Sequence, residues 1–236
     1  MSTFWNNLSA GYYDKLIING IDKNRGIQAN WHNLTFLEVK KLVTDKNKHL
    51  DFACGSGTFI GYYLQQDSVG VDISEKQIEY ANTKYNKVGN FITLKEFNEI
   101  IKKDSFDVIT VLGLFEFISD SEVQKLMEKL KDILNANGKI VITFPSFNKL
   151  FDILLSISSS IGNVDYSEEH HKRKDLESLI KIFQDLEFKK IKVSKIINLG
   201  IFFSFFNLKL GEKINNFFAK MFNNRFGFLY LIEISN

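Results

Sequence analysis

The stretch HLDFACGSGTF, residues 49–59, joins a short apolar run to a cluster of small residues. Residues 49–53 have the length and composition of a buried strand. Gly55 and Gly57 follow, and glycine allows a backbone to turn sharply or to approach a bound molecule closely. A helical pattern begins near Thr58, and the first turn of a helix offers free amides to an anionic group. The stretch therefore predicts a strand, a ligand-binding turn and a helix.

Similar apolar runs alternate with helical patterns from about residue 48 onward. This alternation predicts an α/β fold, a doubly wound and mostly parallel sheet with helices on both faces. Capping boxes at Ser74 with Gln77 and at Ser119 with Glu122 indicate two helix starts. Strands are expected at residues 49–53, 68–72, 90–94, 106–112, 138–144, 188–196 and 226–234.

The 236 residues are expected to form a single domain, 1–236, in which residues 1–45 are an N-terminal helical cap. The segments 145–171 and 197–225 are longer than ordinary connections, so we interpret them as inserted lid or substrate segments. Residues 197–225 are crowded with phenylalanine. This pattern fits an apolar wall for an acceptor or a surface helix in peripheral contact with a membrane, and it also fits core or dimer packing.

The composition narrows the classes of partner. Thirty basic and 28 acidic residues are interspersed and give a net charge of +2, which predicts no nucleic-acid partner. The lone Cys54 allows no internal disulfide and no paired-cysteine metal site, so we expect a cytoplasmic protein without metal. No apolar run reaches the roughly 18 residues of a spanning helix, so no integral membrane segment is expected. A monomer and a homodimer both remain open.

An acid at the end of the second predicted strand indicates the ligand class. Asp72 follows Gly55 by 17 residues, a position from which a carboxylate can bind both hydroxyls of a ribose. Dinucleotides and S-adenosylmethionine both contain that sugar, so an NAD-dependent oxidoreductase is an alternative. A dinucleotide fingerprint needs a closing Gly or Ala, but the two possible frames end at Ile60 and Thr58.

Three motifs together resemble the class I S-adenosylmethionine-dependent methyltransferases, particularly the group acting on small molecules and quinone-like lipids. They are DFACGSG (51–57), VGVDIS (69–74) and SFDVITVLGLFEFISD (105–120), and residues 168–180 are similar to a later helix of that family. The resemblance covers about residues 48–196. It implies a Rossmann-like seven-stranded sheet of order 3-2-1-4-5-7-6 with an antiparallel last strand. It also implies S-adenosyl-L-methionine as cofactor, S-adenosyl-L-homocysteine as product, and a small-molecule or lipid-like acceptor.

The resemblance also implies cofactor contacts, among them a tyrosine near Tyr13 that closes over the cofactor. Arg25 is a further candidate, because a guanidinium suits the methionine carboxylate. The remaining contacts are Asp51, Ala53, Gly55 and Gly57 for the methionine part, Asp72 for the ribose, Ile73, Glu96 and Phe97 for the adenine, and Leu112 with Gly113 beneath the sulfonium.

No catalytic residue is fixed by the sequence. His170 and His171 lie in a predicted loop near the ligand edge, where an imidazole can accept a proton or merely face water. In the family a histidine often follows the glutamate after the fourth strand, but here Phe117 follows Glu116. The candidates are His170, His171, Glu116 and Tyr13. Alignment and exclusion of water can also suffice for transfer from a sulfonium, and a non-catalytic cofactor-binding partner protein is a second alternative.

Overall fold

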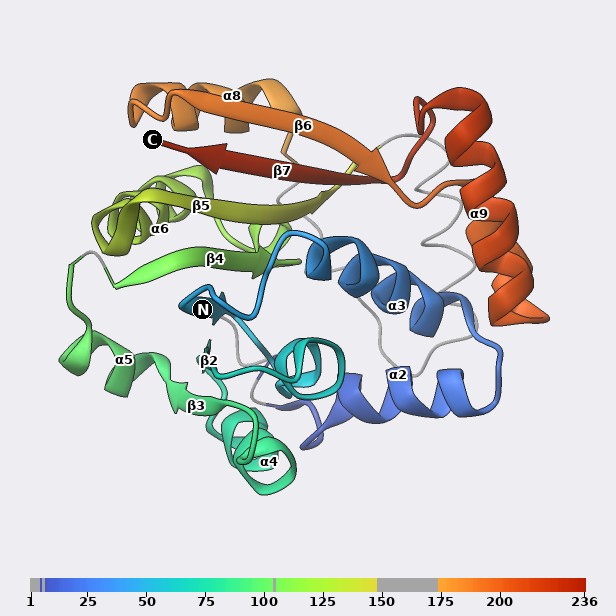
Figure 1. Cartoon of the computed structure of the whole chain (residues 1–236), viewed down its shortest axis with the longest axis horizontal. Coiled ribbons are helices and arrows are strands. Elements are labelled where there is room, and N and C mark those ends of the chain that lie inside the picture. Colours follow the sequence, from blue (N-terminus) through green and yellow to red (C-terminus); the bar gives the residue numbers. More distant parts are fainter. Residues whose placement is uncertain (1–4, 6, 104, 148–173) are drawn as a thin grey trace.

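The computed structural model describes residues 5, 7–103, 105–147 and 174–236 (Figure 1). Seven strands form one sheet in the order β3-β2-β1-β4-β5-β7-β6. The first five strands pair in parallel, and β7 runs antiparallel to both β5 and β6, which confirms the predicted topology. The strands are β1 (His49–Phe52), β2 (Ser68–Asp72), β3 (Asn90–Thr93), β4 (Phe106–Leu112), β5 (Leu134–Pro145), β6 (Lys190–Ile196) and β7 (Leu229–Ser235).

Helices cover both faces of the sheet because alternate residues of the central strands are buried on opposite sides. In β4, Ile109 and Val111 pack in one hydrophobic cluster while Val108 packs in the other. The first cluster includes α6 and α8, and the second includes α2, α3, η1 and η4. The helices are α2 (Tyr12–Asp22), α3 (Ile27–Lys40), η1 (Phe59–Leu64), α4 (Glu75–Tyr85), α5 (Leu94–Ile100), η2 (Phe115–Phe117), α6 (Asp120–Ile133), α8 (Leu176–Asp185), η4 (Leu199–Phe205) and α9 (Leu208–Phe222).

One of the two predicted capping boxes is wrong. Ser119 and Glu122 form the expected reciprocal pair at the start of α6. Ser74 precedes α4, but its side chain makes no capping bond. The Gln77 side chain instead accepts from the amide of Gly11 and donates to the carbonyl of Ser9, so a long-range contact replaces the local one.

The segments outside the alternating pattern differ in structure and in how much of them is described. The described residues before β1 include the helices α2 and α3. Most of the segment 197–225 forms η4 and α9. Of the segment 145–171 only residues 145–147 are described, so His170 and His171 lie outside the described residues. Within the described ranges, no helix combines the length and apolarity needed to cross a membrane.

Candidate functional site

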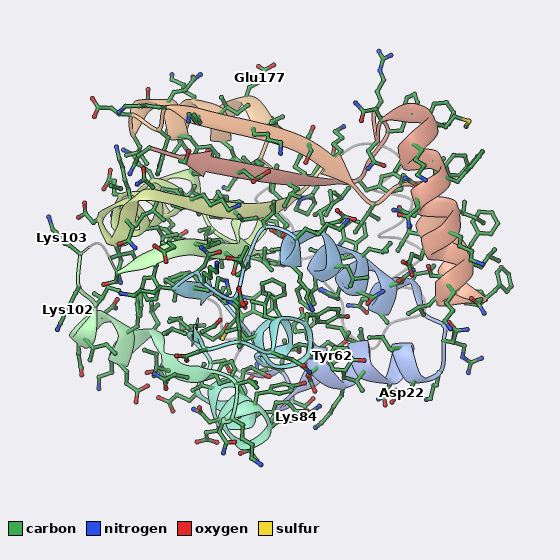
Figure 2. All side chains as sticks on the ribbon, in the orientation of Figure 1. Asp22, Tyr62, Lys84, Lys102, Lys103 and Glu177 are labelled. Carbon is green, nitrogen blue, oxygen red and sulfur yellow. The ribbon has the colours of Figure 1, made fainter. Side chains whose placement is uncertain are left out.

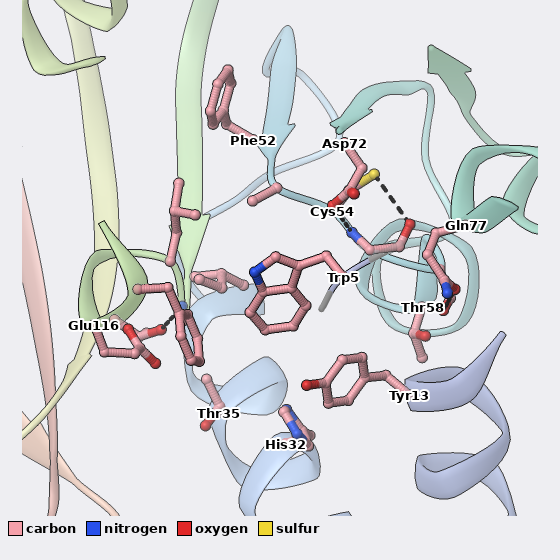
Figure 3. Close-up of a pocket in the computed structure, with 18 of the residues that line it drawn as sticks. Trp5, Tyr13, His32, Thr35, Phe52, Cys54, Thr58, Asp72, Gln77 and Glu116 are labelled. Carbon is pink, nitrogen blue, oxygen red and sulfur yellow. Dashed lines mark hydrogen bonds between the residues drawn. The ribbon is translucent and has the colours of Figure 1, made fainter. Parts of the chain in front are cut away.

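A cavity of about 610 Å³ lies at the carboxyl ends of β1, β2 and β4 (Figure 3). This volume is within the range of small-molecule sites. We call the side formed by residues that follow the strands the sheet wall, and the side formed by residue 5, α2 and α3 the helix wall. The sheet wall includes Ala53, Gly55, Asp72, Ile73, Leu112 and Gly113, and the helix wall includes Trp5, Tyr13, Trp31, His32, Thr35 and Phe36.

The turn after β1 has a left-handed backbone at Ala53, Gly55 and Gly57, with φ of 64°, 53° and 73°. A Cβ on Gly55 would meet no atom within 4 Å, so its backbone is open for a ligand to approach. A Cβ on Gly57 would lie 2.6 Å from the Phe91 ring. The prediction that both glycines make room for the ligand therefore fits only Gly55, because Gly57 is needed for packing against β3.

Backbone amides hold the Asp72 carboxylate at the cavity. Oδ2 accepts from the Gly55 amide at 2.9 Å, and Oδ1 accepts from the Ser74 amide at 2.8 Å. Burial raises the pKa of Asp72, and amide hydrogen bonds, those from Ser74 and Gly55 among them, oppose that rise. A carboxylate has about four acceptor positions, so both oxygens can accept further hydrogen bonds from a ligand's hydroxyls.

Asp51 lies beneath the cavity and is not among the residues that line it. Its side chain is buried and accepts a hydrogen bond from Thr110 Oγ1 at 2.7 Å. Burial raises the pKa of Asp51 to about 7, against the opposing effect of the Thr110 hydrogen bond. Asp51 therefore supports β1 and the turn from below, whereas the sequence predicted a direct contact with the methionine part.

The other predicted cofactor contacts fall into two groups. Ile73, Leu112 and Gly113 line the cavity, as does Tyr13. Glu96, Phe97 and Arg25 lie away from it. Glu96 forms the capping box of α5 with Thr93. Phe97 lies in the core, where its ring centroid is 6.2 Å from that of Phe52. Arg25 is exposed in the turn between α2 and α3.

The start of α5 explains why Glu96 and Phe97 are displaced. The helix begins at Leu94, directly after β3, so Glu96 occupies the third helical position and completes the cap. Phe97 then faces the core and is 2% exposed. Leu94, which the sequence analysis did not select, lines the cavity in their place.

Aromatic rings dominate the helix wall. Tyr13 and His32 point toward the Trp5 ring in Figure 3, and the Tyr13 and His32 ring centroids are 5.5 Å apart. Trp5 also meets Phe117, edge to face at 4.7 Å. Burial lowers the pKa of His32 to about 4, so its imidazole is neutral at physiological pH. Of the residues of this wall, only Tyr13 was predicted from the sequence.

The missed residues of α3 carry a signal in their spacing. Gln28, Trp31, His32, Thr35 and Phe36 recur at intervals of three, one, three and one, and all line the cavity. Side chains at such intervals lie on the same face of a helix. The spacing indicates a common face, but only the tertiary structure shows that this face covers the ends of the strands.

Glu116 lies at the junction of the two walls, in η2 just after β4. It is 6% exposed, and among the described residues its Oε2 atom has no hydrogen-bond partner. Burial raises the pKa of Glu116 to about 8, partly opposed by a hydrogen bond from its own backbone amide. The side chain therefore holds a proton at neutral pH and can accept one from a ligand under slightly alkaline conditions.

A buried aspartate attaches the helix wall to the rest of the site. Asp14 of α2 accepts hydrogen bonds from Thr58 Oγ1 at 3.0 Å, Tyr80 OH at 2.7 Å, Lys84 Nζ at 2.5 Å and Tyr85 OH at 2.5 Å. Thr58 immediately follows the glycine turn, and the other three donors belong to α4. The network therefore fixes α2 relative to the sheet wall.

Comparisons with known proteins agree with this geometry. The sequence profile of a methyltransferase domain matches residues 50–140, which is less than half of the chain. An uncharacterized protein of Rickettsia prowazekii is 28% identical over 153 residues, which cover 58% of this chain and 59% of the relative. The chain thus spans about three fifths of the length of this curated relative.

Two solved structures share the fold. A SAM-dependent methyltransferase from Archaeoglobus fulgidus is 19% identical with a TM-score of 0.57, covering 86% of this chain and 94% of its own. Magnesium protoporphyrin IX methyltransferase from Synechocystis, solved with bound SAH, is 15% identical with a TM-score of 0.58. The match covers 95% of this chain and 97% of the Synechocystis chain. Together they confirm the predicted Rossmann-like fold with its seven-stranded sheet, and the profile match shows that residues 50–140 are similar to a methyltransferase domain.

Proposed function

We propose that the methyltransferase domain of residues 50–140 makes this chain a class I S-adenosyl-L-methionine-dependent methyltransferase that acts on a small-molecule or lipid-like acceptor. The observation that carries the proposal is a single cavity with two chemically different walls. The sheet wall offers open backbone and a fixed carboxylate, and the helix wall offers aromatic rings. Such a cavity suits a polar nucleoside donor on one side and an apolar acceptor on the other.

The sheet wall fits the parts of S-adenosylmethionine. Asp72 has acceptor positions left for the two ribose hydroxyls. Open space at Gly55 lets the methionine part lie against the backbone, while Ile73 and Leu94 give apolar contacts for the adenine. When bound, S-adenosylmethionine supplies a methyl group made electrophilic by its sulfonium, so the protein's contribution is mainly alignment and exclusion of water.

The helix wall and Glu116 favour an acceptor with an apolar or aromatic body and one N–H or O–H group. Rings of Trp5, Tyr13 and Trp31 provide large contact areas for such a body. The unpartnered Oε2 of Glu116 can receive the hydrogen bond of the reacting group and then its proton as the group is methylated. Glu116 is thus the proposed proton acceptor among the candidates that lie within the described residues.

The cofactor assignment is tested by calorimetric titration with S-adenosylhomocysteine and with NADH. We expect binding of S-adenosylhomocysteine and none of NADH, since the dinucleotide fingerprint is incomplete. Asp72→Ala should weaken S-adenosylhomocysteine binding about a hundredfold, because two hydrogen bonds to a charged group are lost. Asp67→Ala, an exposed acid in the loop before β2, is the control and should bind normally. Binding of NADH alone would support an oxidoreductase instead.

The reaction is tested by incubating the protein with methyl-labelled S-adenosylmethionine and a fractionated cell extract. Label in the lipid or small-metabolite fraction supports the proposed acceptor class. Label in protein or nucleic acid contradicts that class while leaving methyl transfer intact. If the cofactor binds but no fraction accepts label, the chain is a non-catalytic cofactor-binding protein and the proposal fails.

A further inference from the structure

Exposed apolar side chains are concentrated on η4, α9 and the turn after them. Of the 13 large hydrophobic residues that are exposed in the described part of the chain, nine lie within residues 199–226. The most exposed are Phe206 at 74%, Phe217 at 60% and Phe226 at 55%. Single exposed hydrophobic residues are ordinary on protein surfaces, but a cluster of this size indicates a binding surface.

The pattern along α9 separates an inner face from an outer one. Leu208, Gly211 and Asn215 are buried against the protein, whereas Leu210, Phe217 and Met221 are exposed. Residues 210, 217 and 221 are spaced by seven and four, so they share one face of the helix. Figure 2 shows side chains on the outer side of α9 projecting away from the rest of the molecule. We call this exposed apolar stripe, with Phe205 and Phe206 of the preceding turn, the outer face.

A basic stripe runs beside the outer face. Three exposed lysines of α9 are spaced by four and seven residues: Lys209, Lys213 and Lys220. Each lies one position before an apolar residue, namely Leu210, Ile214 or Met221, so the lysines form a row next to the apolar one. Residues 199–226 contain these three lysines, Arg225 and one acid, Glu212, which gives a net charge of +3. Because the whole chain has a net charge of +2, the remainder is slightly acidic. Positive charge is therefore concentrated at the exposed apolar surface.

Hydrogen bonds hold the outer face in a fixed position beside the cavity. Asn30 of α3 donates to Ser204 Oγ at 2.6 Å, and the amide of Gly26 donates to the Ser204 carbonyl at 2.7 Å. The amide of Leu208 donates to the carbonyl of Asn24 at 2.9 Å. Since α3 also carries Trp31 and His32 of the helix wall, the outer face and the cavity share one supporting helix.

We propose that the outer face binds the surface of an anionic lipid bilayer. An amphipathic helix with aromatic and aliphatic residues on one side and lysines beside them is suited to lie in the interface, with the rings among the acyl chains and the ammonium groups at the phosphates. A second copy of the chain is a poorer occupant, because a symmetric contact would place this positive surface against itself. Binding to lipid does not require the proposed methyltransferase activity.

The proposal is tested by cosedimentation of the full chain with vesicles of phosphatidylcholine alone and of phosphatidylcholine with one quarter phosphatidylglycerol. We expect binding only to the anionic vesicles, weakened by added salt. Replacing Lys209, Lys213 and Lys220 by Gln should lower the partition coefficient about a hundredfold, since each charge near the surface contributes roughly a factor of five. The matched control replaces three exposed lysines away from η4 and α9, Lys46, Lys87 and Lys125, by Gln and should leave binding unchanged.

A second variant tests the apolar contribution. Phe217→Ser with Met221→Ser should lower the partition coefficient at least tenfold, because two inserted side chains lose their apolar contacts. Ile100→Ser, an exposed apolar residue on α5, should have no effect. The proposal is overturned if wild-type protein ignores anionic vesicles, or if the control variants lose binding as strongly as the α9 variants. A concentration-dependent dimer that Phe217→Ser with Met221→Ser abolishes, without vesicle binding, would assign the face to a second copy and also overturn it.

Discussion

The two walls of the cavity are built in different ways. The sheet wall comes from residues that directly follow β1, β2 and β4, and its main features are a left-handed turn and one carboxylate held by amides. The helix wall comes from residues before β1 and consists mainly of aromatic side chains. Strand ends create the first wall automatically, since parallel strands finish at one edge. The second wall depends on apolar packing and long-range hydrogen bonds that together hold α2 and α3 over that edge.

This difference bears on function as well as on assembly. A wall made of backbone and strand ends has little freedom to change, so it suits a cofactor that stays the same. A wall of side chains on helices can change its shape through substitution while the sheet is preserved. The profile match covers residues 50–140, so it includes the sheet wall but not the helix wall. The helix wall is therefore where acceptor specificity is expected to be determined.

Asp14→Ala should break the attachment of the helix wall and have the largest effect. The carboxylate accepts four hydrogen bonds, and its loss leaves the Tyr85 hydroxyl and the Thr58 hydroxyl without their acceptor in a buried setting. We expect the free energy of unfolding to fall by roughly 3 kcal/mol. Urea denaturation measures the change. Asp22→Ala, an exposed acid on the same helix, is the control and should change stability by less than about 0.5 kcal/mol.

Asp14→Ala should also reduce acceptor-dependent turnover more than S-adenosylhomocysteine binding. The reason is that the bonds lost belong to the helix wall, whereas Asp72 and Gly55 stay in place. Equal stability of the Asp14 and Asp22 variants would contradict a structural role for this network. Equal losses of cofactor binding and of turnover would show that the two walls do not act separately.

Gln77→Ala tests a smaller link between the same walls. Its Oε1 accepts from the Gly11 amide at 3.0 Å and from Ser56 Oγ at 2.7 Å, and its Nε2 donates to the Ser9 carbonyl at 3.0 Å. Three buried or half-buried hydrogen bonds are lost, so the free energy of unfolding should fall by about 2 kcal/mol. Gln124→Ala, at an exposed hydrogen bond on α6, should change stability by less than about 0.5 kcal/mol. A neutral Gln77 variant would mean that these hydrogen bonds do not contribute to holding the helix wall.

Sequence reasoning located the sheet wall better than the helix wall. Gly55 and Asp72 were predicted from their positions after β1 and at the end of β2, Ile73 was implied by the family resemblance, and all three line the cavity. The places of Gly55 and Asp72 at this edge follow from chain topology, which alternating apolar runs reveal. The resemblance implied adenine contacts at Glu96 and Phe97, but β3 ends at Thr93, one residue before its predicted end, and α5 starts at once, so neither residue lines the cavity. An error of one or two residues at a helix start changes which side chain faces a ligand.

The helix wall depends on tertiary packing that no local pattern specifies. Trp31 and His32 share a face with Phe36, but this spacing is equally typical of an ordinary core helix. Gln77 matched a capping box by its position, yet its side chain is used at long range. Glu116 was a candidate from the motif after β4, but its burial and its unpartnered oxygen are apparent only in the folded structure.

Glu116→Gln tests the junction of the two walls through pH. In the folded chain the pKa of Glu116 is about 8, against an ordinary value of 4.5. Between pH 7 and 8 the folded state therefore binds a proton that the unfolded state has lost, so the free energy of unfolding falls as pH rises, by at most about 1.4 kcal/mol per pH unit. The variant should lose the larger part of this slope, and the buried Asp51, with a pKa of about 7, accounts for part of what remains. His32 and His49, with pKa values lowered to about 4 and about 3, are largely neutral in both states above pH 7 and do not contribute.

The same variant separates a chemical role from a purely structural one. As a proton acceptor, Glu116 makes wild-type turnover rise toward pH 8, where its carboxyl ionises, while Glu116→Gln should be slow and show a flat profile. Asp51→Asn is the matched control, since Asp51 is also a buried carboxyl, with a pKa near 7, but lies beneath the cavity. Asp51→Asn should change how the free energy of unfolding depends on pH below pH 7. It should leave the rise in turnover toward pH 8 intact. If Glu116→Gln keeps that rise, another group accepts the proton, and the junction only shapes the cavity.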